Sequence, residues 1–361
     1  MANQNIGTPR FYIDELSWLK SSGVDINISQ TSGAWHTVSG EMNNLFGLNP
    51  SNGVEIAIDG THGNDTIYIV NSDFNFTENQ YYYVAVLGHN FKSFNGWYRL
   101  DAYGGTPESG AYPTQRWIIN GIVHTSYGLE PDFNGFSIAE YFSQDTDRWR
   151  FQINPIGASN YLNEEEAEYT GNLKIGSIVL GRYYDMPHSP ELSLTMSHEY
   201  DGIKRQETAG GSTLSYADYY KPPDWGNLQA WQLDGWDRKY SGRRVWDLAF
   251  NYLSDSDIEP YHYHMDSTPP GATHPGNHDN WKDNWFTNVI HYTNGGQLPF
   301  IFCPDPARYD SNGTLISGTE YSESTRTIPE FAICRFDMKT FKREQVANGV
   351  YNIKVKIKES W

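Results

Sequence analysis

The chain has 361 residues and a formal net charge of −18, which corresponds to a sequence pI near 4.9. A negative field of this size repels nucleic acid and argues against a DNA-binding protein, and no run of residues approaches the roughly 18–20 apolar positions of a membrane span. Because single cores stop growing near about 250–300 residues, the length predicts two domains, in which aromatic residues, 15% of the chain, are expected to carry much of the burial.

The start of the chain is predicted to be irregular apart from one short helix. The segment DELSWLKSSG offers Asp14 as the helix N-cap and Gly23 as the usual helix stop. Leu16 and Leu19, with Trp18 beside them, would face inward. The first residues, MANQNIGTPR, lack the apolar segment of a secretory signal, so we expect synthesis in a cytoplasm without export.

From residue 53 the pattern changes to short strands separated by Gly, Asn, Asp and Pro clusters. Such spacing predicts an antiparallel sandwich or barrel, and about eight strands suit a jelly roll. DMPHSPEL, 185–192, has two prolines and no periodicity, so we place a domain boundary there, between a jelly-roll domain of residues 1–187 and a second domain of residues 188–361. The predicted strands are GVEIAID, TIYIVN, YYYVAVLGHN, WYRLDAY, RWIINGIVHTSYG, SIAEYFS, RWRFQIN and LKIGSIVLGRYY.

The second domain is predicted to be rich in strands, with one packed helix. RRVWDLAFNYLS alternates, which puts Trp246, Leu248, Phe250 and Tyr252 on one face. In NWKDNWFTNVIHYTNGG the apolar residues switch to helical spacing, and Asn294-Gly295 closes the helix. LPFIFCPD, FAICRFD and VYNIKVKIKE complete the unit. The predicted fold class is therefore mostly β.

The last strand, in GVYNIKVKIKESW, carries a row of lysines on a chain that is otherwise acidic. Tyr351, Ile353, Val355 and Ile357 alternate with polar residues, so one face of the strand is apolar and the other cationic. Two readings are open: lysines that guard a sheet edge against unwanted pairing, or a surface that meets a negative partner. The residues concerned are Lys354, Lys356 and Lys358.

Metal and hydrolytic chemistry have weak signals. His262, His264, His274 and His278 lie in HYHMDSTPPGATHPGNHDN with Asp266 and Asp279, but their spacing matches no known metal cage. The acidic pairs that could serve a glycosidase are Glu164-Glu165-Glu166 and Asp255-Ser-Asp257, and adjacent acids are more often a solvated loop. We predict no catalytic residue, no metal and no cofactor.

For the remaining reactive or aromatic residues we prefer a structural role over a functional one. Cys303 and Cys334 lie in apolar strand-like segments, which favours small buried side chains over a disulfide or a nucleophile. Trp35, Tyr112 and Trp225 could stack on sugar rings from loops, or lie half-buried over a sandwich edge.

Two groups of segments resemble known families. YYYVAVLGHN, WYRLDAY, RWRFQIN and LKIGSIVLGRYYDMP resemble the galactose-binding or discoidin-type jelly-roll modules of phage virion proteins, over about residues 50–187. GRRVWDLAFNYLSDSD, DNWFTNVIHYTNGGQLPFIFCPD and FAICRFDMKTFKREQVANGVYNIKVKIKESW resemble minor tail and distal tail proteins of long-tailed bacteriophages, over about residues 190–361.

The resemblance implies a structural, non-enzymatic component of a virion, near the tail tip and made in the host cytoplasm. It implies copies of the chain in a ring, other tail proteins as neighbours, and a jelly roll that faces a host glycan or another virion protein. A capsid-surface position is a further possibility. The lysine row would then meet an acidic patch of the adjacent subunit. The alternatives are a glycan-binding adhesin and a polysaccharide-degrading enzyme.

Overall fold

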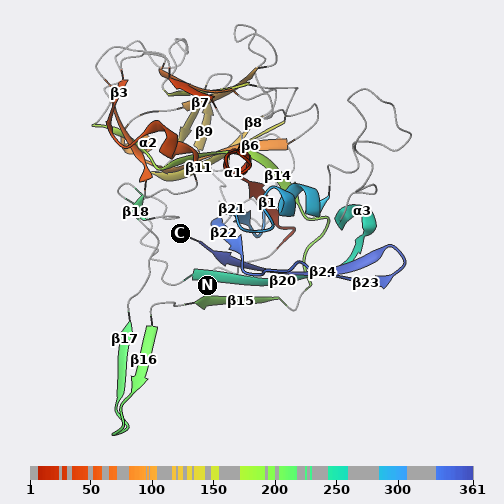
Figure 1. Ribbon diagram of the computed structural model, residues 1–361. Coiled ribbons are helices and arrows are strands. Elements are labelled where there is room, and N and C mark those ends of the chain that lie inside the picture. The colour runs from red at the N-terminus through yellow and green to blue at the C-terminus, as the bar shows by residue number, and fades with distance from the viewer. Residues whose placement is uncertain are drawn as a thin grey trace, which may run out of the picture.

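Strands dominate the computed structural model, so the predicted mostly β class is confirmed (Figure 1). The structure describes residues 7–23, 27–30, 35–47, 52–58, 65–70, 81–94, 96, 98–103, 116–118, 121–124, 128–131, 134–142, 148–153, 171–191, 194–199, 203–217, 224–225, 228–229, 243–258, 284–306 and 331–360. No helix in these ranges is long and apolar enough to cross a membrane.

From residue 53 to residue 185 the strands follow most of the predicted segments, although RWIINGIVHTSYG, predicted as one strand, contains two. The start of the chain was predicted to be irregular apart from one helix, and this is wrong: three strands lie before residue 50, because they pair with strands further along the chain that no local pattern reveals. The strands of the first half are β1 (Arg10–Ile13), β2 (Asn27–Gln30), β3 (Trp35–Ser39), β4 (Val54–Ile58), β5 (Asp65–Val70), β6 (Tyr81–His89), β7 (Tyr98–Tyr103), β8 (Arg116–Ile118), β9 (Gly121–His124), β10 (Gly128–Pro131), β11 (Gly135–Phe142), β12 (Arg148–Ile153), β13 (Leu173–Ile175) and β14 (Ser177–Asp185). Its helical segments are α1 (Glu15–Ser21), the 3-10 turn η1 (Met42–Phe46) and α2 (Phe91–Phe94).

The second half adds a further set of strands and two short helices. The strands are β15 (Thr195–Glu199), β16 (Ile203–Glu207), β17 (Thr213–Ala217), β18 (Asp224–Trp225), β19 (Leu228–Gln229), β20 (Arg243–Ser254), β21 (Phe300–Cys303), β22 (Ala332–Phe336), β23 (Arg343–Ala347) and β24 (Val350–Glu359). The helices are α3 (Asp255–Ile258) and the π-helix η3 (Phe286–His291).

The predicted first helix is confirmed in its caps and in its buried face. Asp14 caps α1 by accepting a hydrogen bond from the Ser17 backbone N–H at 3.1 Å. The chain leaves the helix at Gly23, whose φ of 78° is in the left-handed region that glycine tolerates. Leu16 and Leu19 are buried beneath the helix, as their spacing predicts.

One long sheet runs through both halves of the chain. Its strand order is β15-β20-β24-β22-β21-β1-β14-β6-β11-β8, with β23 paired to β24. The N-terminal strand β1 lies in the middle, where it pairs antiparallel with β14 on one side and with β21 on the other. Strands from both sides of residue 187 share this one hydrogen-bonded sheet. The domain boundary predicted at that position stays a prediction.

The first-half residues pack as a sandwich. The sheet β2-β5-β12-β7-β10-β9 supplies Tyr98, Trp149 and Phe151, which pack against Tyr82 of β6 and Leu180 of β14. The Tyr82 and Trp149 rings meet edge to face with their centroids 4.7 Å apart, a favoured arrangement of aromatic pairs. We call this cluster the sandwich core; it matches the expectation that aromatic residues carry much of the burial.

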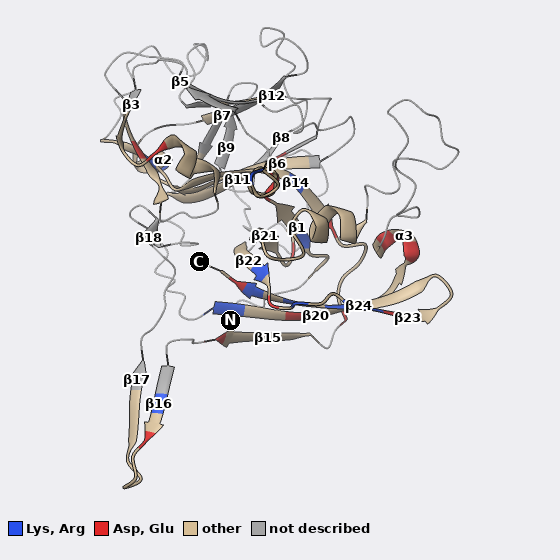
Figure 2. Ribbon diagram, in the orientation of Figure 1, with Lys and Arg blue, Asp and Glu red and all other residues tan. Residues whose placement is uncertain are grey.

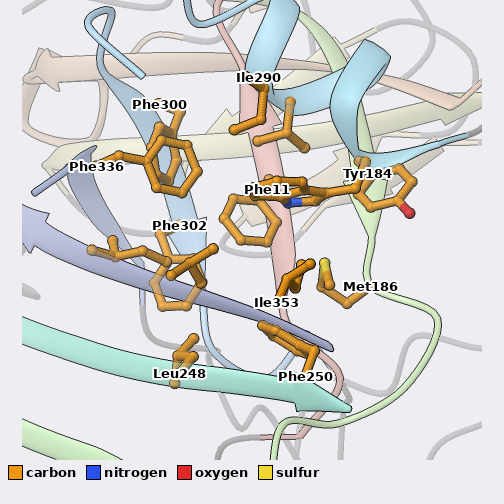
Figure 3. Packing of buried hydrophobic residues seen from close by; sticks show 14 of the residues in the cluster. Phe11, Tyr184, Met186, Leu248, Phe250, Ile290, Phe300, Phe302, Phe336 and Ile353 are labelled. Carbon is orange, nitrogen blue, oxygen red and sulfur yellow. The ribbon is translucent and has the colours of Figure 1, made fainter. Parts of the chain in front are cut away.

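A second cluster, the helix-covered core, lies under η3 (Figure 3). Figure 3 shows Phe11 of β1 surrounded by side chains from β14, β20, β21, β22, β24 and η3. The labelled members are Phe11, Tyr184, Met186, Leu248, Phe250, Ile290, Phe300, Phe302, Phe336 and Ile353.

The two faces of β14 separate these clusters from a third. Ile178 and Leu180 join the sandwich core and Tyr184 joins the helix-covered core, whereas Val179 and the partly buried Tyr183 belong to a middle core on the opposite face. The middle core contains Tyr12, Tyr83, Ala85, Leu87, Phe136, Ile138, Val179, Ile301, Cys303, Phe331 and Ile333. Strand β1 is therefore buried on both faces, and its residues hold the two halves together.

Two details of the second half differ from the sequence prediction. Tyr252 was predicted to share a face with Trp246, Leu248 and Phe250, which are buried, but it is 79% exposed at a φ of 60°, because a bulge between Phe250 and Leu253 adds a residue to β20. Leu253 takes the buried place instead. The predicted helix before Asn294 exists as a π-helix, whose wider turn still buries Val289 and Ile290.

Candidate assembly surface

The terminal strand β24 has the two faces that its alternation predicts. Ile353, Val355 and Ile357 are buried in the helix-covered core. Lys354 points away from them and is exposed. The apolar side of the strand therefore anchors it, and the lysine side is left toward solvent.

The edge-guard reading of the lysines is wrong, because β24 is an interior strand. It pairs with β20 along one side, from Val245↔Lys358 to Ser254↔Val350. Its other side pairs with β22 and with β23. The ladders with β22 and β23 leave a gap at residues 354–356, where the Asp337 N–H donates to the Lys356 carbonyl, so most of the second edge is covered and little open ladder is left to protect. The sequence could not show this, since alternation is the same for interior and edge strands with one solvated face.

Two of the three lysines are paired within the chain. Lys356 Nζ lies 2.7 Å from Asp337 Oδ2 and 3.9 Å from Glu199 Oε1. Lys358 Nζ donates to the other Glu199 oxygen. The hydrogen bond to Asp337, followed by the charges of Asp337, Glu199 and Asp247, raises the pKa of Lys356, so this ammonium group stays charged. No carboxylate of the described residues lies within ion-pair distance of Lys354.

Pairing registers extend the lysine row into a larger charged surface. Arg335 is paired with Lys358 across β22 and β24, Asp247 with Lys356, and Glu199 with Arg243. Partners in an antiparallel ladder point to the same face, and Figure 2 shows these strands coloured by charge. On β23, Glu344 is paired with Asn352, which alternates onto the same side as the lysines. We call this surface the basic face; it consists of Arg243, Arg335, Lys354, Lys356 and Lys358 with the carboxylates of Glu199, Asp247, Asp337 and Glu344.

The opposite side of the same strands holds a buried ion pair. Arg244 Nη2 lies 2.9 Å from Glu359 Oε1, and the Arg244 backbone N–H donates to Glu359 Oε2 at 3.0 Å. Both side chains are nearly inaccessible, and Arg244 Nη2 also donates to the Phe331 carbonyl at 3.2 Å. Sequence reasoning missed this pair; an arginine and a glutamate at apolar-face positions of two predicted strands were the only signal.

Two further polar clusters join strands at the centre of the molecule. Glu140 accepts hydrogen bonds of 2.6 Å from Arg10 and from the Tyr12 hydroxyl, so β1 is tied to β11. Burial, followed by the negative charge of Glu140, raises the pKa of Tyr12, which keeps the phenol protonated and donating. Glu15 of α1 accepts from Arg182 Nε at 2.6 Å. Their acidic groups are engaged in these contacts, which gives the clusters a structural role.

The other residues singled out in the sequence form no recognisable reaction centre in the described part of the chain. Asp257 accepts from the Ser254 backbone N–H at 2.8 Å, so it caps α3. Cys303 and Cys334 are free and buried, as predicted, and burial raises the pKa of both thiols. In the ranges described, no three His, Cys, Asp or Glu side chains converge as a metal site would require.

Several sequence candidates lie beyond the description of the structure. The histidines His262, His264, His274 and His278, the acids Asp266 and Asp279, the run Glu164-Glu165-Glu166 and Tyr112 fall outside the described residues. Trp35 and Trp225 lie in β3 and β18, and only the backbone is described at these positions. The basic face is therefore the candidate site whose geometry can be argued.

Comparison with known proteins gives no family for the chain. No protein-family model matches it. No curated protein is significantly similar to it.

Proposed function

We propose that the chain is a structural, non-enzymatic subunit of a tailed-phage virion, in the tail or at the tail tip, where it associates with copies of itself and with other tail proteins. The proposal combines the resemblance of the sequence to tail proteins with the charge distribution of the folded chain. The observation that carries it is the basic face.

The charge of the basic face is opposite to that of the rest of the chain. Five cations against four carboxylates give this face +1, so the remaining residues carry −19. The basic face of one copy is thus attracted to acidic parts of another copy. Such fields steer association and fix orientation more than they add affinity, and salt screens them.

The location of the face suits a contact between subunits. Its cations lie on the interior strands β20, β22 and β24, whose inner side is packed into the helix-covered core, so the face is preorganised before any partner binds. Lys354 and Arg335 are exposed on it. A preorganised surface loses little conformational entropy on association.

The test reverses the two exposed charges that have no described carboxylate partner. Lys354→Glu with Arg335→Glu avoids Lys356 and Lys358, whose reversal would place like charges beside Asp337 and Glu199. The control is Lys92→Glu with Lys174→Glu, which changes the net charge by the same amount at two exposed lysines, on α2 and β13. Self-association is measured by sedimentation velocity over a range of protein and salt concentrations.

We expect the unmodified chain to associate, more weakly at high salt. Because each exposed ion pair is worth up to about 1 kcal/mol, the double reversal should weaken association roughly tenfold, while the control leaves it unchanged. A chain that stays monomeric at every concentration, or that shortens a host polysaccharide, would refute the proposal. Binding of a glycan without self-association would favour an adhesin.

A further inference from the structure

The hairpin formed by β16 and β17 stands clear of the rest of the molecule. Figure 1 shows it extending away from the body, beyond the strand β15 that precedes it. Its five residue pairs run from Ile203↔Ala217 to Glu207↔Thr213, and the two strands form a sheet of their own. No described strand outside the hairpin pairs with either of them.

Within the part of the chain that the structure describes, the hairpin has few contacts to stabilise it. Every side chain described in it, from 205 to 215, is exposed, and Leu214 is 59% exposed. An isolated two-stranded hairpin is at best marginally stable in water, because a third strand or a packed face is needed. A projecting hairpin of this kind is therefore a candidate for stabilisation by another molecule.

The long sheet ends in an open edge next to the hairpin. Strand β15 is the terminal strand, and among the described strands it pairs only with β20. Its inner side is held by the partly buried Met196, which packs on the helix-covered core. β15 has five residues, and so has each strand of the hairpin. A free edge and a free hairpin of equal length can complete each other's main-chain hydrogen bonds.

We propose that the β16–β17 hairpin of one copy adds to the β15 edge of a second copy. Two copies that exchange hairpins close as a two-fold pair, whereas a contact passed on to a third copy builds a ring or a filament. Leu214 is the anchor, since it is the large apolar side chain among the exposed residues 205–215. The inference rests on the proposed self-association and names the contact through which it acts.

The first experiment removes the hairpin. Residues 203–217 are replaced by a short Gly-Ser loop, which leaves the pairing of β15 with β20 intact. A second variant is Leu214→Asp. Its control is Val38→Asp, which introduces the same charge at another exposed apolar residue, on β3. We expect the loop variant to lose association and Leu214→Asp to weaken it about tenfold or more, with Val38→Asp unchanged.

The second experiment locates the contact. Both native cysteines are buried, so an introduced surface cysteine is the reactive thiol. Chains carrying Leu214→Cys are mixed with chains carrying Ser197→Cys on β15, and a short thiol cross-linker is added. The matched mixture replaces Leu214→Cys by Val38→Cys. We expect a cross-linked dimer from the first mixture and little from the second.

The outcomes separate this inference from the proposed function. If the chain associates equally well with and without the β16–β17 hairpin, the proposed hairpin contact is wrong, but the proposed self-association is not. Equal cross-linking in both mixtures would also contradict the hairpin contact. A third test uses the double variant Ser197→Cys/Leu214→Cys at dilutions where the chain is monomeric. A cross-link formed within single chains there would mean that the hairpin reaches β15 of its own chain, which contradicts the proposal. A chain that never associates overturns both proposals.

Discussion

Asp14 gives the molecule a pH dependence that a single substitution can isolate. Burial raises the pKa of this N-cap carboxyl to about 6, and the hydrogen bonds from Ser17 and the charge of Lys20 only partly oppose the shift. The folded chain therefore binds this proton more tightly than the unfolded chain, in which the pKa is about 3.9. The cost of the ionised carboxylate is absent below about pH 4 and is complete above about pH 6.

We predict that Asp14→Asn stabilises the protein at pH 8 and not at pH 4. Asparagine is an equally good N-cap, so the cap is kept while a cost of up to about 3 kcal/mol is removed. The measurement is the free energy of unfolding in urea at several pH values for both proteins. Burial also lowers the pKa of His89 to about 3, which weakens both proteins as pH falls below about 6.5, so this effect cancels in the difference. A difference that does not change between pH 4 and pH 8 would contradict the prediction.

Removing only one partner of the Arg244–Glu359 pair should destabilise the fold, whereas replacing both partners by apolar residues should not. Arg244→Met leaves a carboxylate that is 2% exposed without its cation, which is expected to lower the free energy of unfolding by about 3–5 kcal/mol. Adding Glu359→Leu removes the stranded charge and should recover most of the loss. Urea unfolding of the single and double variants checks this. If the double variant is as unstable as the single one, packing around Arg244, and not its charge, is what matters.

At the level of elements, the junction between β1 and β14 depends on a glycine. A methyl group at Gly181 would collide with the Ile13 carbonyl oxygen, and with the Glu15 backbone nitrogen at 3.1 Å. Because both obstacles are backbone, neither can move aside without shifting β1 and α1. We predict that Gly181→Ala lowers the free energy of unfolding by about 3 kcal/mol. Gly210→Ala, at a position with open space around it, is the control and should be nearly neutral.

Local patterns predicted most of these elements, and tertiary pairing decided the rest. The alternation in YNIKVKIK and the caps around Asp14 and Gly23 are written in neighbouring residues, so those elements were found. The bulge at Tyr252 was missed because an extra residue in β20 is fixed by its partner β24, as the hydrogen bond from the Tyr252 backbone N–H to Asn352 Oδ1 indicates. The β16–β17 hairpin carries few apolar residues, so periodicity gave no signal for it.

The arrangement of the whole sheet was beyond sequence reasoning for a physical reason. Strand β1 is only four residues long, and its neighbours β14 and β21 lie more than 160 and 280 positions further along the chain. No local pattern encodes such distant pairing. The same holds for the basic face: the sequence showed the lysines, but Arg335, Glu199 and Asp247 join them only through the ladder.

The continuous sheet makes a prediction about the two predicted domains. If residues 1–187 are produced alone, β1 loses β21, and the middle core loses Ile301, Cys303, Phe331 and Ile333. The fragment would then expose an unpaired strand edge beside the apolar rings of Tyr12 and Phe136, a combination that favours aggregation. We expect this fragment to be insoluble or to lack a cooperative unfolding transition.

Co-production with residues 188–361 supplies the missing strands. It tests whether the fragment 1–187 fails because it lacks β21 and β22 or because residue 187 is an unsuitable place to end it. The two fragments should be recovered together as a soluble complex, held by pairing of β1 with β21 and by the contacts of Phe11 with Phe300 and Phe302, whose ring centroids lie 5.5 and 5.4 Å from it. Substituting Phe11→Asp in the first fragment should abolish recovery of the complex, because a charge would enter the helix-covered core. If residues 1–187 instead form a soluble monomer that unfolds cooperatively, β1 contributes little to the joining of the halves, and the chain consists of two independent domains.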